Sequence, residues 1–463
     1  MNPTADPIAD EVEPSLRIPV EAYLSADYAK AERDKLWRKV WQVACRIEEI
    51  PEVGDYITYD ILDDSIIVAR LTPDRIVAYH NVCPHRGRRL TDGCGHAKGF
   101  ACRFHGWSWG LDGRNLGVTR KQGYGDALPA EDIRLHDVNV DCWGGWVFVN
   151  LDPDCESLAS HLGIARQMLD PFELDRMRYR WRQWLHFPCN WKVAIEAFNE
   201  GYHVVGTHPQ LAVYSDKPTW SSARGIHGNF GSAQRQGVGG ATGGAAGAPD
   251  MRKGLAVSLN QVWEEVWATT TQVMVDVANR LVDELPEGTS APDVQAHFMK
   301  RVIEEDAARG VTWPALDPEH VADAGTDWHI FPNTVIIHGP TFALCYRARP
   351  NGYDPDSCIF EVYTLERFPE GEEPRPENLY TPERAAPHWP KVLLQDFSNM
   401  GDVQKGMKSM AFAGARPHPL EEQPIINFHR TLARYMGTGA PEPCDKPQDR
   451  HKPLHSARDR ISP

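Results

Sequence analysis

The chain has 463 residues, with 49 Lys plus Arg against 64 Asp plus Glu, which gives a formal net charge of −15. A prior of about 150 residues per domain predicts two to four domains. An acidic chain without a local basic run is not expected to bind nucleic acid or an anionic membrane. Ten cysteines are too sparse for a disulfide scaffold, so we expect reduced thiols, some of them metal ligands.

The N-terminal region, residues 1–19, is acidic and rich in proline, and it lacks the basic start and apolar stretch of a signal peptide. No run approaches the ~20 apolar residues that span a bilayer, so the sequence predicts a cytoplasmic protein. Residues 28–41 predict a short amphipathic helix before the first strand. The residues expected to share its apolar face are Tyr28, Leu36, Val40 and Trp41.

Between residues 51 and 151 the hydrophobic pattern changes to the period of two that is typical of strands. Gly, Pro and Asp separate the short β-rich runs, which lie at residues 55–59, 65–71, 75–79 and 145–151. This stretch predicts a compact all-β module of about one hundred residues.

After residue 152 the pattern is mixed. Helical patterns lie at residues 156–170, 191–205, 255–285, 291–310 and 391–413. Strand patterns lie at residues 179–187, 328–339, 342–348 and 359–368. Asn190 is a suitable N-cap for the second helix. The chain as a whole is therefore expected to be α+β.

Two further segments are expected to lack regular structure. The glycine-rich stretch 237–248 has neither the strand-then-helix context nor the lysine of a phosphate loop, so we expect a mobile flap rather than a nucleotide site. The tail from residue 440 is rich in proline and charge, and we expect it to be extended or disordered.

The first motif that points to chemistry pairs two cysteines with two histidines. Cys83-Pro-His85 is followed, after sixteen residues, by Cys102-x-x-His105. Each short loop can present one thiolate and one imidazole, and two facing loops would form a Cys₂His₂ metal site. Soft thiolates with imidazoles suit zinc or an iron–sulfur centre.

The arrangement of the pairs favours the iron–sulfur centre. Zinc fingers usually pair Cys with Cys and His with His along the chain, whereas a Rieske [2Fe–2S] cluster has two Cys on one iron and two His on the other. Structural zinc and unliganded surface residues remain the alternatives. Cys94 and His96 also form a Cys-x-His pair, but they lie between the two loops and are expected to be ordinary loop residues.

A second constellation lies on the helix expected at residues 191–205. His203 and His208 are five residues apart, which fits a helix that ends near Gly206 with the second histidine on the next turn. A mononuclear iron(II) oxygenase needs two His and one carboxylate on one face of the metal. Alone, this pair of histidines is weak evidence for an iron site. It becomes stronger beside the expected iron–sulfur cluster, because a one-electron carrier needs a redox partner.

With these motifs the sequence resembles the Rieske non-heme iron oxygenases, specifically the α (large, catalytic) subunits of aromatic ring-hydroxylating dioxygenases. The resemblance runs from about Tyr28 to Phe412. The motifs that carry it are Cys83-Pro-His85-Arg-Gly, Cys102-x-x-His105-Gly-Trp107, Asn190-Trp-Lys…Glu200-x-Tyr-His203…His208, His329-x-Phe331-Pro-Asn333 and Gln395-Asp396-Phe…Gln404-x-Gly406.

The resemblance implies a role for each motif. Cys83, His85, Cys102 and His105 would hold the [2Fe–2S] cluster, and His203, His208 and Asp396 would hold the mononuclear Fe(II). Asp402 and, more remotely, Glu196 compete for the carboxylate position. Glu200 stands where the family has the acidic residue, most often Asp, that bridges the cluster of one subunit to the iron of its neighbour. Ala197 replaces an Asn found in many relatives, which puts the hydrogen bonding around Glu200 in doubt.

The resemblance also implies the fold and its division. The expected fold is an all-β Rieske domain inserted near the N-terminus of a helix-grip catalytic domain, an antiparallel sheet with a long helix. The expected units are an N-terminal segment packed on the catalytic domain (1–45), the Rieske domain (46–152), the catalytic iron domain (153–440) and an extended tail (441–463). Such a protein would take electrons from NAD(P)H through a flavin reductase and a ferredoxin, and would form a homotrimer or an α3β3 assembly.

Three functions remain open from the sequence. They are cis-dihydroxylation of an aromatic or other hydrophobic small molecule, monooxygenation or oxidative demethylation on the same scaffold, and electron transfer by a Rieske protein without catalytic iron. Residues 156–463 argue against the third function, because a carrier needs only the β module. The substrate pocket is expected to be mostly apolar, with Ala194, Phe198, Val204 and Leu211 in its wall.

Overall fold

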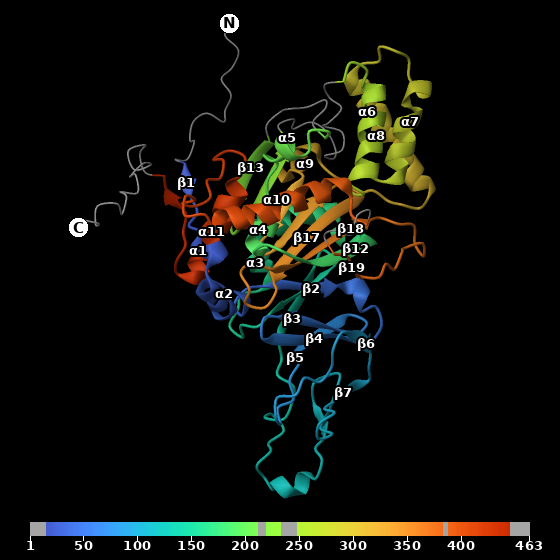
Figure 1. Ribbon diagram of the computed structural model, residues 1–463. Helices are drawn as coiled ribbons and strands as arrows, with labels where there is room; N and C mark the ends of the chain where they lie inside the picture. Colours follow the sequence, from blue (N-terminus) through green and yellow to red (C-terminus); the bar gives the residue numbers. More distant parts are fainter. Residues whose placement is uncertain (1–14, 212–218, 233–247, 383–387, 445–463) are drawn as a thin grey trace, which may run out of the picture.

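The computed structural model describes residues 15–211, 219–232, 248–382 and 388–444 (Figure 1). The glycine-rich stretch, except Ala248, and the tail beyond residue 444 lie outside the described residues, so the expectations for them stay predictions. None of the described helices is long and apolar enough to cross a membrane.

The expected β module forms the lower lobe in Figure 1. It consists of three antiparallel sheets with strand orders β5–β4–β3–β6, β7–β8–β9 and β10–β11–β2. The strands are β2 (Gln42–Arg46), β3 (Asp55–Ile61), β4 (Asp64–Thr72), β5 (Arg75–His80), β6 (Cys94–His96), β7 (Gly99–Ala101), β8 (Ser108–Gly110), β9 (Asn115–Gly117), β10 (Asn139–Trp143) and β11 (Trp146–Asn150). Alternate residues of β4 and β5 pack under Trp107 and Trp109 in one core, as the period of two requires.

The N-terminal segment is only partly helical. It contains α1 (Glu21–Leu24), α2 (Ala26–Glu32) and a π-helical turn, η1 (Arg33–Trp37), so the helix expected over 28–41 ends early. The Ser25 side chain caps α2 by accepting a hydrogen bond from the Tyr28 amide at 3.2 Å. The four residues expected on one apolar face are all buried.

The catalytic lobe is built on one large sheet. Its strand order is β13–β14–β15–β16–β17–β18–β12–β19, and every pairing is antiparallel except β12 with β19. The strands are β12 (Arg178–Phe187), β13 (Thr219–Arg224), β14 (His227–Ser232), β15 (Asp327–Ile330), β16 (Thr334–His338), β17 (Phe342–Pro350), β18 (Cys358–Glu366) and β19 (Leu379–Tyr380). The single strand expected at 328–339 is therefore two strands, β15 and β16.

Helices cover both faces of this sheet. Helices α4 (Trp191–Glu196), α10 (Lys391–Met407) and α11 (Gln423–Met436) pack on one face, which we call the helix face. On the opposite face α3 (Leu158–Leu169) and α9 (Pro318–Ala324) join a second core. The long α10 is the helix of the expected helix-grip arrangement.

A three-helix bundle projects from the catalytic lobe at the upper right of Figure 1. It consists of α6 (Met251–Glu265), α7 (Gln272–Glu284) and α8 (Ala291–Ala308), so the helix expected over 255–285 is two helices. The bundle has its own core of residues such as Leu259, Leu281 and Phe298.

The two ends of the described chain lie together. Strand β1 (Leu16–Arg17) pairs with β20 (Glu442–Pro443), and Ile18 bridges to Ala415. The remaining short helices are η2 (Ile47–Glu49), η3 (Lys121–Tyr124), η4 (Asp170–Phe172), η5 (Leu174–Arg176) and α5 (Val204–Thr207).

Candidate metal centres

The two loops that carry the Cys–His pairs have matching backbone geometry. Cys83 and Cys102 each accept, through the carbonyl oxygen, a hydrogen bond of 2.9 Å from the glycine four residues later. Their amides donate to Arg88 and Trp107 carbonyls at 2.8 and 2.7 Å. Gly87 and Gly106 close the turns with φ of 75° and 74°, a backbone conformation that residues with a side chain rarely adopt. The sequence thus folds both loops in one way.

The donor atoms of the two loops face one another. The imidazole rings of His85 and His105 lie 4.5 Å apart between centroids, and the Nδ1 atoms of both are buried without a hydrogen-bond partner. On its other side, His85 Nε2 lies 3.4 Å from the Tyr124 hydroxyl. The thiols of Cys83 and Cys102 are buried beside each other. Two thiols and two inward Nδ1 atoms fit the ligand set of a Rieske cluster.

Backbone amides point at both sulfur atoms. Burial raises the pKa of Cys102, but the amides of Phe104 and His105 outweigh it and lower the pKa of this thiol overall. The amide of His85 similarly opposes the rise that burial causes in the pKa of Cys83. Amide donors of this kind stabilise thiolates at a cluster. Trp107 stacks on His85 with 4.9 Å between ring centroids and holds the ring in place.

The competing Cys-x-His pair lies elsewhere. Cys94 and His96 belong to β6, which pairs with β3, and both are exposed. The His96 Nδ1 atom is 2.9 Å from the Asp55 carboxylate. The structure therefore gives them the ordinary surface roles that were expected.

The segment with the two remaining histidines is not one continuous helix. Asn190 caps α4 as expected, accepting a hydrogen bond from the Lys192 amide at 3.1 Å, but α4 ends at Glu196. The chain then turns through Gly201, where a Cβ atom would lie 2.6 Å from the Thr219 side chain. Only glycine allows this close approach, so the segment between α4 and α5 can pass directly against β13.

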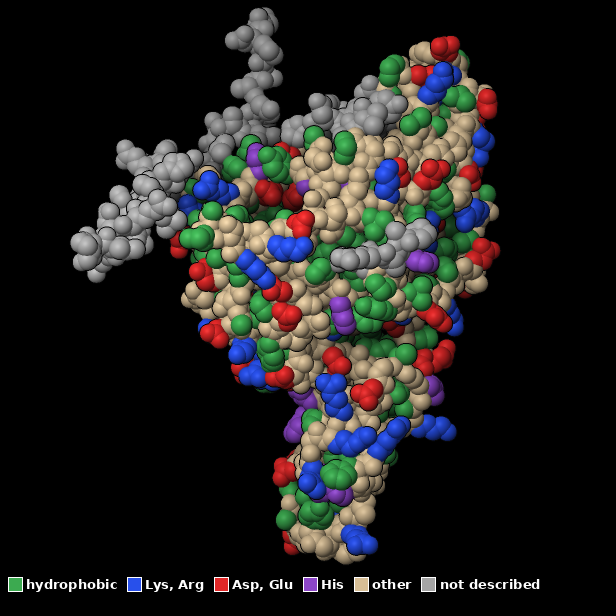
Figure 2. Space-filling view, in the orientation of Figure 1, with side chains coloured by type: hydrophobic (Ala, Val, Ile, Leu, Met, Phe, Trp, Pro, Cys, Tyr) green, Lys and Arg blue, Asp and Glu red, His purple; other side chains and the backbone are tan. Residues whose placement is uncertain are grey.

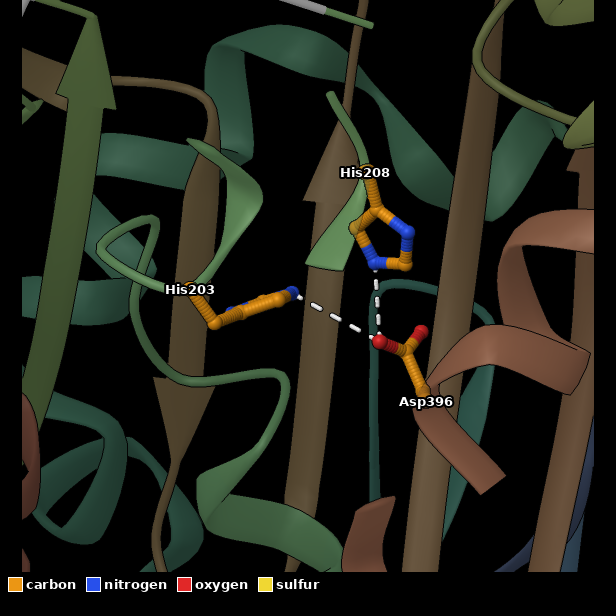
Figure 3. Close-up of side chains that lie close together, drawn as sticks. All are labelled: His203, His208 and Asp396. Atoms are coloured by element: carbon orange, nitrogen blue, oxygen red, sulfur yellow. Dashed lines mark ion pairs between the residues drawn. The ribbon is translucent and has the colours of Figure 1, made fainter. Parts of the chain in front are cut away.

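The break places both histidines at the ends of the one-turn helix α5. His203 precedes it and His208 follows it, and both Nε2 atoms point at the carboxylate of Asp396 on α10 (Figure 3). The distances to Asp396 Oδ1 are 3.7 Å from His203 and 2.8 Å from His208. One donor atom from each of the three residues lies within 4.8 Å of the others. Two imidazoles and a carboxylate in this arrangement fit a mononuclear iron(II) site.

The outward nitrogen of each histidine has its own acceptor. His203 Nδ1 lies 2.7 Å from Glu200 Oε1, and His208 Nδ1 lies 2.9 Å from the side-chain oxygen of Gln395. Burial opposes protonation of His203, but the Glu200 carboxylate and then Asp396 raise the pKa of His203 overall. Such partners fix the ring orientation of metal-binding histidines. The sequence reasoning assigned no role to Gln395, although it directly precedes Asp396.

The two competing carboxylates are placed elsewhere. Glu196 accepts hydrogen bonds from the Tyr23 hydroxyl at 3.0 Å and lies 2.6 Å from His429. Asp402 is 76% exposed and pairs with Lys405. Neither belongs to a group of described residues that could hold a metal ion.

The four residues expected in the pocket wall are dispersed around this site. Ala194 is fully buried in α4, and Phe198 stacks on Tyr346 of β17 with 3.9 Å between ring centroids. Val204 and Leu211 are half-buried on either side of His208. The sequence did not predict that Tyr346 packs against Phe198, because this contact depends on the position of β17 in the sheet.

Comparisons with known proteins identify both lobes. The family model "Ring hydroxylating alpha subunit (catalytic domain)" matches residues 174–438, and the model "Rieske [2Fe-2S] domain" matches residues 40–126. The second match contains both Cys–His loops, and the first contains His203, His208 and Asp396.

Curated relatives include enzymes of two kinds. The carnitine monooxygenase oxygenase subunit of Escherichia coli (strain K12) is 30% identical over 218 residues, and biphenyl 2,3-dioxygenase subunit alpha of Rhodococcus jostii (strain RHA1) is 30% identical over 202 residues. The alignments cover 46% and 42% of this chain. They span 57% and 44% of the relatives, so the chain matches about half the length of these proteins.

The fold itself is shared along nearly the whole chain. A crystal structure of a quaternary ammonium Rieske monooxygenase in complex with L-carnitine has a TM-score of 0.61 with this structure, at 17% sequence identity. The superposition covers 92% of this chain and 97% of the other.

Proposed function

The chain belongs to the ring-hydroxylating alpha-subunit family, and on that premise we propose that it is a terminal oxygenase component. It uses O₂ and electrons that originate from NAD(P)H to hydroxylate an aromatic or other hydrophobic small molecule. The observation that carries the proposal is the convergence of two imidazoles and one carboxylate at His203, His208 and Asp396, in the same chain as a Rieske-type donor set.

Two metal groups are assigned to the chain. Cys83, His85, Cys102 and His105 would hold the [2Fe–2S] cluster, and His203, His208 and Asp396 would hold the iron. When bound, the cluster supplies electrons one at a time and the iron binds and reduces O₂ beside the substrate.

The chain's own residues orient these groups. Glu200 accepts hydrogen bonds from both the ring and the amide of His203, and it keeps that ring turned toward Asp396. Gln395 does the same for His208. An iron held by these three residues alone would have room for O₂ and substrate, and their proximity would select the atom that is oxidised.

We propose that the protein works as a homotrimer or an α3β3 assembly, in which Glu200 bridges the iron of one subunit to the cluster of its neighbour. A ferredoxin, a flavin reductase or both would supply the electrons, because no dinucleotide fingerprint is found in the chain. A cytoplasmic location is proposed with it, since all ten cysteines are free thiols.

The unit boundaries proposed for this protein are residues 1–45, 46–152, 153–440 and 441–463. The pairing of β2 with β11 ties residues 42–46 to the second unit and so favours a first boundary a few residues earlier than 45. Contacts from Tyr23 and Glu32 to the catalytic helices support packing of the first unit on the third.

A second candidate outcome is monooxygenation or oxidative demethylation on the same scaffold. It is favoured by the similarity to a carnitine monooxygenase subunit, whereas the biphenyl dioxygenase subunit supports dihydroxylation. A substrate screen with a surrogate reductase separates the two, because dihydroxylation yields a diol, whereas the alternative yields a phenol or formaldehyde.

Metal analysis tests the proposal directly. Anaerobically purified protein should contain about three irons and about two acid-labile sulfides per chain. Zinc without sulfide would refute the oxygenase assignment and favour a zinc module, and iron at the cluster stoichiometry alone would favour an electron carrier.

The variant Asp396→Ala separates the two metal centres. It should lose the third iron and its activity while keeping the visible spectrum of the cluster, because Asp396 lies in the other lobe. Asp402→Asn on the same helix is the control and should keep all the iron. Retention of the full iron content in Asp396→Ala would show that the third ligand is a different residue.

A further inference from the structure

One buried carboxyl group in the catalytic lobe has no partner. Six acidic residues are buried among the described residues: Glu32, Glu200, Asp306, Asp327, Glu361 and Asp396. Five of them accept a hydrogen bond or form an ion pair, with Lys192, His203, Trp313, Arg347 and His208 respectively. Both oxygens of Asp327 lack any hydrogen-bond partner, although the residue is only 1% exposed.

Such a group is costly in the core of a protein. Burying a polar group without a hydrogen bond is unfavourable, and burying an ionised carboxylate is more so. Nearly all buried polar side chains are therefore satisfied. Exceptions concentrate at functional sites, where a ligand supplies the missing partner.

The strand register places Asp327 on the helix face of the sheet. It is the first residue of β15 and pairs with Phe230 on one side and Ile337 on the other. Because paired residues share a face, the same row continues to Leu344, next to the row of Tyr346. Phe230 and Ile337 are only half-buried, so the side chains on both sides of Asp327 are incompletely covered.

This is the face on which the metal-binding triad lies. Tyr346 experiences the charges of both Asp396 and Asp327, and Phe198 stacks on the Tyr346 ring at 3.9 Å. Asn199, the next residue, is fully buried and its side-chain amide also lacks a partner. Figure 2 shows acidic and histidine side chains recessed in a hollow between α5 and α10. This part of the catalytic lobe thus combines aromatic rings with unsatisfied polar groups.

The local charge around Asp327 is negative. No described lysine, arginine or histidine forms an ion pair with it, and the one other charge that acts on it is the Glu200 carboxylate. Burial first, and Glu200 second, raise the pKa of Asp327 well above its usual range. A cation beside the carboxylate would remove both penalties.

The geometry points to Asp327 as the residue that selects the substrate, and to an organic cation with a positively charged nitrogen as the class of substrate that it selects. This inference rests on the proposed function, since it assigns the pocket beside the iron. It revises the expectation of a mostly apolar pocket, because a single carboxylate beside the aromatic residues would recognise the positive charge of the substrate.

The test compares cations with neutral molecules of the same shape. Choline and 3,3-dimethylbutan-1-ol form a quaternary pair, and 2-(dimethylamino)ethanol and 3-methylbutan-1-ol form a pair in which the cation carries an N–H. Binding to the iron-loaded protein is measured without O₂ or reductant, from the iron-induced relaxation of ligand protons. The readout is independent of turnover, so a failed oxygenase assay leaves it intact.

The wild-type protein should bind the cation of at least one pair about tenfold or more tightly than its neutral partner, a difference of about 1.4 kcal/mol. Asp327→Asn, which keeps the shape and removes the charge, should bring that ratio to within about threefold. Asp402→Asn, an exposed position on α10, should leave it unchanged. A larger ratio of cation to neutral binding in the quaternary pair would indicate an N-methylated ammonium substrate. A larger ratio in the other pair would indicate a protonated amine.

Three results would overturn the inference. They are equal or weaker binding of both cations relative to their neutral partners, an unchanged ratio in Asp327→Asn, and no binding by either cation. Thermal unfolding adds a check on folding, because Asp327→Leu removes the unsatisfied polar group and Asp327→Asn removes its charge. Both variants should melt at or above the wild-type temperature, whereas a clear fall would show that Asp327 supports the fold instead.

Discussion

At the scale of single residues, the metal-binding histidines depend on neighbours that do not touch the metal. Gln395 accepts a hydrogen bond from His208 at 2.9 Å and another from the Gln210 amide at 2.7 Å. It lies one position before Asp396, so two adjacent residues of α10 provide a ligand and the support of a second ligand. The helix can therefore set the geometry of most of the triad.

Replacing Gln395 with Leu should weaken iron binding about 10- to 100-fold, because His208 loses the acceptor that orients its ring. Iron affinity is measured by competition with a chelator, with cluster absorbance as the internal reference. Asn399→Leu, an exposed position one turn later on α10, is the control and should bind iron as the wild type does. Equal affinity in the two variants would show that Gln395 is a bystander.

The donor residues themselves were predictable because thiols and imidazoles at short spacings are chemically specific. Their partners were not. Gln395 belongs to a motif of the resemblance without a role assigned to it, Asp327 belongs to none, and the partners of both depend on which helix or strand lies beside the site. Glu196, a competitor in the sequence, is excluded by its hydrogen bonds to Tyr23 and His429.

At the scale of elements, the N-terminal helix α2 is attached to helix α4 of the catalytic lobe through one buried ion pair. Lys192 of α4 and Glu32 of α2 are 0% and 2% exposed, with 2.6 Å between Nζ and Oε1. Glu32 also accepts a hydrogen bond from the Trp191 indole at 3.1 Å. The segment that leads to His203 is thus attached to the start of the chain.

Lys192→Met alone should lower stability by about 3–5 kcal/mol, because it leaves the Glu32 carboxylate buried and uncompensated. The double variant Glu32→Leu, Lys192→Met should recover most of that loss. Urea unfolding followed by circular dichroism measures both. A double variant that is less stable than Lys192→Met would show that the pair is net stabilising.

A second element contains a carboxyl group that favours the folded state only when it is protonated. Burial raises the pKa of Glu366, at the end of β18, to about 7, although Arg180 at 3.7 Å opposes the rise. The folded-state pKa lies above that of the unfolded chain, about 4.3. Stability from this group is therefore present below the unfolded value and is lost as the pH rises to about 7.

Glu366→Gln should consequently gain stability relative to the wild type between about pH 4.3 and 7, by at most about 1.4 kcal/mol per pH unit. Urea midpoints at pH 5 and pH 8 measure the change in this difference. Glu370→Gln, which is exposed, should show no such change. A difference that is constant with pH would mean that Glu366 ionises normally.

Local sequence patterns were sufficient to predict some of the helices and strands but not others. The strands of the β module were predicted well, because alternation of buried and exposed residues is a local property. The helix over 191–205 was not predicted well: α4 ends at Glu196, and the segment after it packs at Gly201 against Thr219 of β13, a contact with a strand outside the expected helix. The same limit applies to β15 and β16, which were predicted as one strand.

At the scale of the whole molecule, the two metal centres lie in different lobes. The Cys–His loops lie near β7 at the lower end of Figure 1, and the iron segment lies at α5 near the upper end, with the large sheet between them. Electron tunnelling is favoured by short distances, and we therefore propose that the electron comes from the cluster of a neighbouring subunit. The fold class was predictable from the motifs, whereas this separation required the structure.

Mixed oligomers test that route. Cys102→Ser should lose the cluster and Asp396→Ala the iron, and each homo-oligomer should be inactive with the substrate found by the screen. Co-expression should restore activity, because an intact cluster of one subunit can then serve the intact iron of another. Activity that stays at background in mixed oligomers of proven composition would place transfer within one chain.

The matching geometry of the two cluster loops has a consequence for assembly of the protein. Each loop is closed by its own backbone hydrogen bonds and its own left-handed glycine, so the sequence of each loop favours its turn. We therefore expect that a preassembled cluster can be inserted with little loss of conformational entropy. In contrast to zinc fingers, which unfold without metal, the apoprotein should keep its Rieske lobe and remain competent for repair after oxidative loss of the cluster.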